Sequence, residues 1–116
     1  MSLNRLSDKL VFNILAGINV GYLEITNYQG EVFKFGNPQD NLKAKLKIKK
    51  PNFSFNLIKG GSIGFAESYM RGEFETDNLS NLIEITARNI KIIYKFSGLL
   101  DFPIINFLKG IFIKNT

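Results

Sequence analysis

Residues 42–49 read Leu-Lys-Ala-Lys-Leu-Lys-Ile-Lys, and this strict alternation of apolar residues with lysines decides the fold class. Successive side chains of a β-strand point to opposite faces, so a period of two places the four apolar residues on one side. As a helix, the same segment would scatter them around its axis. The sequence therefore predicts a strand with one face in the core and one face of lysines that meets solvent or a ligand.

Upstream of this strand, the patterns predict one helix and a β-hairpin. Apolar residues from Leu3 to Leu15 recur at helical spacing, and Gly17 follows as a stop signal. A strand is expected around residues 21–28. The turn signal Gln29-Gly30 separates it from a partner strand at residues 32–35.

Downstream, the sequence predicts mainly helices. A short helix is expected after Pro51-Asn52, a break at Gly60-Gly61, and a second helix from residue 63 to 70. A long helix should follow a cap at Thr76, Asp77 or Asn78. This order favours an α+β fold with a small, mainly antiparallel sheet and helices packed on one side. We expect residues 1–97 to form this domain and residues 98–116 to form a hydrophobic helical tail or linker.

The composition excludes several kinds of chemistry. The 116 residues contain no His, Cys or Trp, so zinc sites of the usual kind, thiol nucleophiles and Ser-His-Asp triads are excluded. We expect no metal site. The only acid cluster precedes a helix start, where acids favour the helix dipole, and we assign it no catalytic role. Its members are Glu67, Glu73, Glu75 and Asp77.

The net charge of +5 equals one run of lysines in and after the alternating strand, because the rest of the chain has ten bases and ten acids. Such a face suits phosphate-bearing partners such as phospholipid headgroups, and it equally suits a solvated face or a protected edge strand. The strand carries no aromatic residue, so we expect no nucleic-acid partner. The run consists of Lys43, Lys45, Lys47, Lys49 and Lys50.

The segment from Ile92 to Ile113 is the most apolar part of the chain, with fourteen of its 22 residues being Ile, Leu, Phe or Tyr. A helix that is apolar on most sides must be buried in its own core, in a partner or at a membrane interface. Packing onto the domain's own sheet and docking on an external apolar partner both remain open. The candidate anchor or docking residues are Phe102, Ile105, Phe107, Leu108 and Phe112.

Residues 61–79 read Gly-Ser-Ile-Gly-Phe-Ala-Glu-Ser-Tyr-Met-Arg-Gly-Glu-Phe-Glu-Thr-Asp-Asn-Leu. This pattern, with Arg88-Asn89 at the end of the next predicted helix, resembles the N-terminal domain of the cyclopropane-fatty-acyl-phospholipid synthase family. The similarity covers roughly residues 10–116, and Phe74 stands where many members have Trp. The matching positions, interpreted as mainly structural, are Gly61, Gly64, Glu67, Tyr69, Met70, Gly72, Phe74, Thr76 and Leu79.

The resemblance implies a small α+β module, similar to sterol-carrier-type folds, that engages phospholipid and supports a methyltransferase domain. In the family that second domain uses S-adenosylmethionine; its catalytic residues have no counterpart here, so we expect neither enzymatic activity nor a cofactor in this chain. The expected location is the cytoplasmic side of the membrane, at its surface. Lys43, Lys45, Lys47 and Lys49 would face headgroups, and the partner would be a methyltransferase chain or a second copy. The alternative is a structural or dimerisation module that docks on a methyltransferase without binding lipid.

Overall fold

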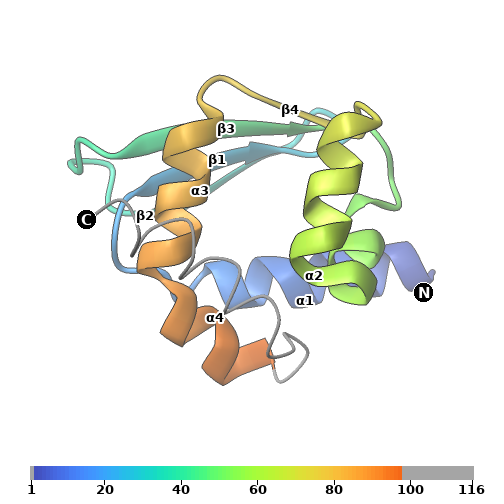
Figure 1. Cartoon of the computed structure of the whole chain (residues 1–116), viewed down its shortest axis with the longest axis horizontal. Helices are drawn as coiled ribbons and strands as arrows, with labels where there is room; N and C mark the ends of the chain where they lie inside the picture. The colour runs from blue at the N-terminus through green and yellow to red at the C-terminus, as the bar shows by residue number, and fades with distance from the viewer. Residues whose placement is uncertain (1, 98–116) are drawn as a thin grey trace.

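The computed structural model describes residues 2–97, with side chains described as far as Ile93, and these residues form eight helices and strands (Figure 1). The predicted tail, residues 98–116, lies outside the described residues, and so do all five candidate anchor residues. In chain order the elements are α1 (Leu3–Leu15), β1 (Tyr22–Thr26), β2 (Val32–Gly36), β3 (Lys43–Ile48), α2 (Phe53–Met70), β4 (Phe74–Thr76), α3 (Leu79–Arg88) and α4 (Ile90–Ser97).

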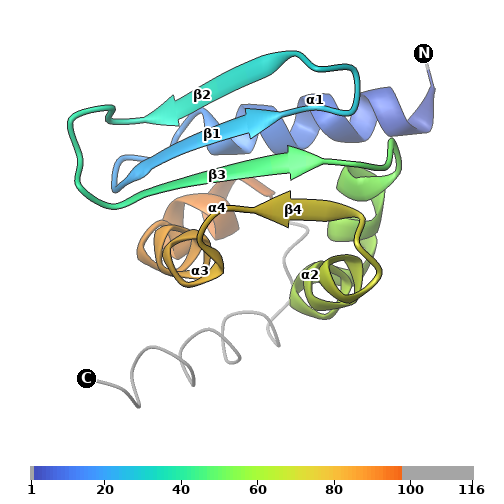
Figure 2. The same ribbon diagram turned by 90° about the horizontal axis from the view of Figure 1, so that it is seen from above.

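The four strands form one sheet in the order β2-β1-β3-β4, which Figure 2 shows from above. The helices lie on one side of this sheet (Figure 1), so the predicted α+β fold is confirmed. The hairpin β1–β2 and the pair β3–β4 are antiparallel, whereas the central pair β1–β3 is parallel. The sheet is therefore mixed, with two of its three pairings antiparallel.

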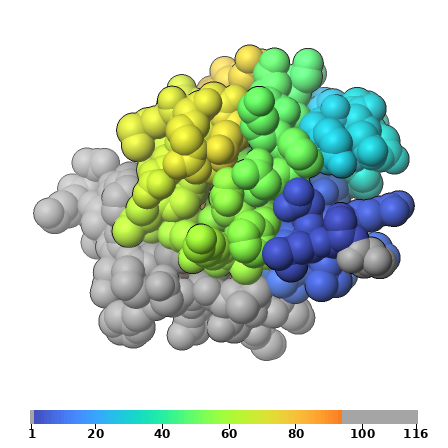
Figure 3. Space-filling model, turned by 90° about the vertical axis from the view of Figure 1, so that its right-hand side faces the viewer, coloured from blue at the N-terminus to red at the C-terminus, as the bar shows by residue number. Residues whose placement is uncertain are grey.

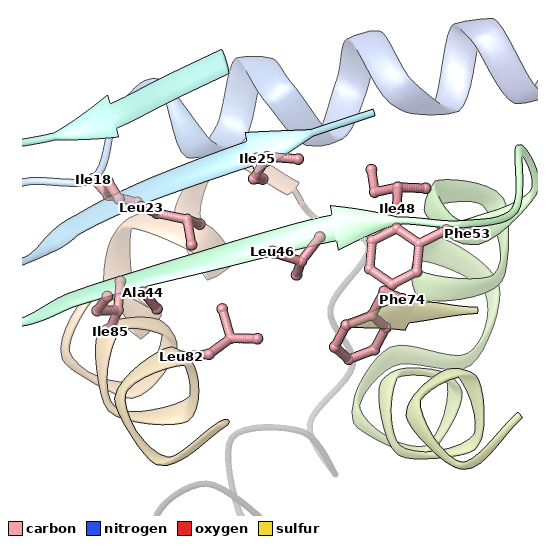
Figure 4. Close-up of a cluster of buried hydrophobic side chains, with 10 residues drawn as sticks. All are labelled: Ile18, Leu23, Ile25, Ala44, Leu46, Ile48, Phe53, Phe74, Leu82 and Ile85. Atoms are coloured by element: carbon pink, nitrogen blue, oxygen red, sulfur yellow. The ribbon is translucent and has the colours of Figure 1, made fainter. Parts of the chain in front are cut away.

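The alternation in β3 is confirmed residue by residue. Ala44, Leu46 and Ile48 are buried, while the lysines between them are exposed. Their inward side chains meet Leu23 and Ile25 of the neighbouring strand in one hydrophobic cluster (Figure 4). The outer face of the sheet carries mainly polar and charged residues, with Val32 of β2 as an exposed apolar residue.

Phe74 of β4 connects the sheet to α2 within the core. It is 1% exposed, and the rings of Phe53, Phe65 and Tyr69 lie 5.1, 5.0 and 5.6 Å from its ring centroid. All three partners belong to α2, so the short strand β4 fixes this helix against the edge of the sheet. An aromatic residue at position 74 is therefore a packing requirement.

The predicted break at Gly60-Gly61 is present as a kink inside α2. Gly61 has φ 58° and ψ −134°, a backbone conformation that L side chains rarely adopt. The two halves of the helix then pack closely at Gly64, where an added Cβ would lie 2.5 Å from the carbonyl oxygen of Asn56. The glycines in the 61–79 stretch thus have a structural explanation.

Candidate functional site

An apolar cavity of about 340 Å³ lies between the inner face of the sheet and the helices. The buried side chains of β1 and β3 form its roof, and all four helices contribute to its walls. Representative lining residues are Leu46 of β3, Leu15 of α1, Leu57 and Phe65 of α2, Ile83 of α3 and Ile93 of α4.

The described lining offers almost no polar group. Only Ser62, Tyr69 and Thr86 among these residues carry a hydroxyl, and the Thr86 hydroxyl already donates to the carbonyl oxygen of Leu82 at 3.0 Å. No charged side chain is among the described lining residues. Water needs two to four polar partners in a cavity, so this space favours an aliphatic group over water. Its volume lies in the range of small-molecule pockets.

The most exposed of the described lining residues belong to the C-terminal half of α2. Ala66, Tyr69 and Met70 contribute to its lining and are also exposed, with 44% of Tyr69 and 76% of Met70 accessible. Figure 3 shows the green and yellow-green atoms of α2 at the surface on this side of the molecule. From this exposure we infer that the mouth of the cavity lies here, among apolar side chains.

The predicted lysine face lies on the other side of the sheet from the cavity. Lys43, Lys45 and Lys47 are exposed on the outer face, whereas their neighbours in β3 point inwards. The ammonium group of Lys45 lies 3.8 Å from the Glu24 carboxylate. That of Lys43 lies 5.8 Å from the centroid of the Tyr22 ring. The sheet thus separates the lysines from the apolar lining.

Lys49 and the acid cluster are engaged in structural contacts. Lys49 pairs with Glu75 at 3.3 Å, and the Asp77 carboxylate accepts a hydrogen bond from the backbone N–H of Lys45 at 2.7 Å. Thr76 donates to the carbonyl oxygen of the same lysine at 2.7 Å. These bonds hold β4 and the start of α3 against β3. Among the described residues no group of three His, Cys, Asp or Glu side chains could hold a metal ion.

Arg71 gathers the remaining acids at the end of α2. Its guanidinium donates to Glu67 at 3.1 Å and to Glu73 at 2.9 Å, and Asn56 donates to Glu73 at 3.2 Å. Arg71 is the main reason why the pKa of Glu73 falls to about 2. Gly72, with φ 71°, makes the turn that brings these groups together. The Glu67 and Glu73 positions therefore connect α2 to β4.

The other residues of the 61–79 stretch divide between packing and the cavity. Leu79, Tyr69 and Met70 contribute to the cavity lining, although the sequence analysis interpreted them as mainly structural. The signal that could have found them is their position at the end of α2 and the start of α3, on either side of the short strand β4.

Asn89 is the most important residue that sequence reasoning left without a role. It is 1% exposed, and its side-chain oxygen accepts hydrogen bonds from the backbone N–H groups of Asn19 and Val20 at 2.9 and 3.2 Å. Its amide nitrogen donates to the carbonyl oxygens of Val20 and Ile85 at 2.8 and 2.7 Å. Asn89 therefore joins the end of α3 to the loop that enters β1.

Asp40 fixes the loop before β3 in a similar way. Its carboxylate accepts backbone hydrogen bonds from Leu42 at 2.9 Å and Gly21 at 2.8 Å, and these bonds lower the pKa of the carboxyl group. The beginnings of the two central strands are thereby held in register.

No family model, curated protein or solved structure matches this chain. The resemblance carried by residues 61–79 and the sterol-carrier-like topology therefore stay predictions. None of the helices in residues 2–97 is both long and apolar enough to cross a membrane.

Proposed function

We propose that this chain is a non-catalytic lipid-associating domain that accommodates an aliphatic chain of a phospholipid in the cavity between sheet and helices. It acts as a peripheral module at the cytoplasmic membrane surface and supports a methyltransferase domain or chain that uses S-adenosylmethionine. The observation that carries this proposal is the nearly complete absence of polar groups from the described cavity lining.

The energetics favour an aliphatic occupant. Each methylene group moved from water into an apolar environment contributes about 0.8 kcal/mol, so ten methylenes would contribute at most about 8 kcal/mol before the costs of binding are subtracted. The absence of a charged residue among the described lining residues leaves the headgroup outside the cavity.

The lysines have a separate role in this proposal, because the sheet lies between them and the cavity. A single phospholipid cannot place its chain among Leu46 and Leu57 and its headgroup on the lysine face. The lysines instead attract the domain to anionic membrane at about 1 kcal/mol each at most. Ion pairs to Glu24 and Glu75 reduce that contribution.

The test is uptake of a fluorescent fatty acid by the delipidated protein in the absence of membranes. We expect saturable binding, and we expect Ile83→Trp, which fills the cavity from α3, to weaken it by about tenfold or more. The matched control is Val32→Trp, which places the same side chain at an exposed position of β2 outside the cavity lining. Absence of saturable uptake, or equal loss in both variants, would refute the proposal.

A second candidate function is a docking module for a methyltransferase chain. The exposed lysine face on the outer side of the sheet favours it, because this face stays accessible to a protein partner when another molecule covers the helical side. Co-purification with a methyltransferase, together with no fatty-acid uptake, would support this alternative over the first.

A further inference from the structure

We infer that the C-terminal half of α2, rather than the lysine face, is the surface through which this protein docks on a lipid bilayer. The inference rests on the proposed function and deepens it, because it names the side of the domain that receives the lipid chain. We call this surface the α2 docking surface and define it by Ile63, Ala66, Tyr69 and Met70.

The exposed apolar residues of this half-helix fall on one side. Ile63 is 66% exposed and Met70 is 76% exposed, and Ala66 lies between them at the spacing of helical neighbours. Large apolar side chains with this degree of exposure, gathered on one element, are typical of surfaces that contact a membrane or a partner. An interfacial helix buries such residues at the boundary between headgroups and acyl chains.

Continuity with the cavity identifies the partner as a bilayer. Three of the four residues, Ala66, Tyr69 and Met70, also contribute to the cavity lining. An aliphatic chain that leaves the bilayer at this surface therefore enters the cavity along apolar side chains, without crossing water. Docking through the lysine face would place the whole sheet between the bilayer and the cavity.

Charged side chains lie at the edge of the α2 docking surface. Glu67 and Arg71 form an ion pair at 3.1 Å, and both side chains are about half exposed. Arg71 also donates to Glu73 at 2.9 Å, so this polar cluster stays at the level of the headgroups while the apolar neighbours insert. Tyr69 likewise has an apolar ring and a polar hydroxyl, which suits this depth.

The decisive experiment measures which side of the protein contacts acyl chains. The chain contains no Trp, so Ile63→Trp and Met70→Trp each introduce a single fluorophore without background. The control, Lys45→Trp, reports from the outer face of the sheet. Vesicles of phosphatidylcholine with brominated acyl chains should quench the fluorophores at positions 63 and 70 and spare the one at position 45.

A charge substitution tests whether contact drives binding. We expect Ile63→Glu to lower vesicle partitioning by about tenfold, because an apolar side chain that docking buries in the bilayer is replaced by a charged one. Ile63 is absent from the cavity lining, so uptake of the fluorescent fatty acid without vesicles should persist. Lys47→Glu, which alters the other face, should leave partitioning into phosphatidylcholine vesicles unchanged.

Each outcome has a distinct meaning. Quenching at position 45 with none at 63 and 70 overturns the inference in favour of docking through the lysine face. Unchanged vesicle partitioning of Ile63→Glu, or no partitioning of the unsubstituted protein, overturns it as well. Loss of fatty-acid uptake in the unsubstituted protein is a separate result, because it refutes the proposed function itself. Circular dichroism of every variant confirms that the fold is intact.

Discussion

Replacing Asn89 with Ala should strongly destabilise the fold, because its buried side chain makes four hydrogen bonds. The substitution removes the acceptor of the Asn19 and Val20 backbone N–H groups. It also removes the donor to two carbonyl oxygens. A buried group that loses its hydrogen-bond partner costs about 1–3 kcal/mol. The loop is only partly buried, so water can compensate in part, and we expect a total loss of about 3 kcal/mol.

Urea unfolding followed by circular dichroism measures this loss, provided that the transition is two-state and its slope is unchanged. In a chain of this length, about 3 kcal/mol corresponds to a fall of about 12 °C in the melting temperature. The control is Asn19→Ala, which changes an exposed side chain of the same loop and retains the backbone N–H that bonds to Asn89. A loss below about 1 kcal/mol for Asn89→Ala would refute the reasoning, because it would mean that water replaces all four bonds.

Three further predictions follow from the geometry. Gly64→Ala should cost about 1–3 kcal/mol in urea unfolding, because the new Cβ meets the Asn56 carbonyl oxygen at 2.5 Å. The control is Gly60→Ala, whose new Cβ faces open space and which should be neutral or slightly stabilising. Arg71 lowers the pKa of Glu73 from 4.5 to about 2. The ion pair between Glu73 and Arg71 therefore stabilises the fold fully above pH 4.5, and this stabilisation is lost as the pH falls towards 2. Glu73→Gln should therefore flatten stability over that interval, and an unchanged profile would contradict the ion pair. Removing four exposed charges should weaken binding to anionic vesicles and reduce its salt dependence, with no effect on neutral ones; the four substitutions are Lys43→Gln, Lys45→Gln, Lys47→Gln and Lys49→Gln.

Local sequence patterns were sufficient to predict most of the secondary structure. The period of two in residues 42–49 predicted the buried and exposed faces of β3 correctly. The Gln29-Gly30 turn predicted the β1–β2 hairpin. Asn78, one of three candidate caps, does accept a hydrogen bond from the Asn81 backbone N–H at the start of α3. Each of these features depends on residues that are close in the sequence, which is why pattern and propensity were sufficient.

The cavity and the parallel pairing of β1 with β3 could not be predicted in the same way. Alternation specifies which face of a strand is buried and contains no information on the direction of its neighbour. The cavity exists because residues from α1, α2, α3 and α4 meet beneath the sheet. Asn89 bonds to residues about seventy positions away, and its sequence context shows only a polar residue at the end of a helix. Such long-range contacts become visible only in three dimensions.

The separation of the lysines from the cavity determines how the two parts of the proposed function can cooperate. Lysine attraction acts over about one Debye length and weakens with salt, whereas burial of Ile63 and Met70 requires direct contact and depends little on salt. Attraction through the lysines alone would turn the cavity mouth away from the membrane. The two faces therefore compete for an anionic bilayer, and added salt should shift the protein from the lysine face to the α2 docking surface. On anionic vesicles with brominated chains, quenching of the fluorophore at position 63 should rise with salt while total binding falls. If quenching and total binding instead declined together, the lysine face and the α2 docking surface would have to contact the bilayer from one side of the molecule.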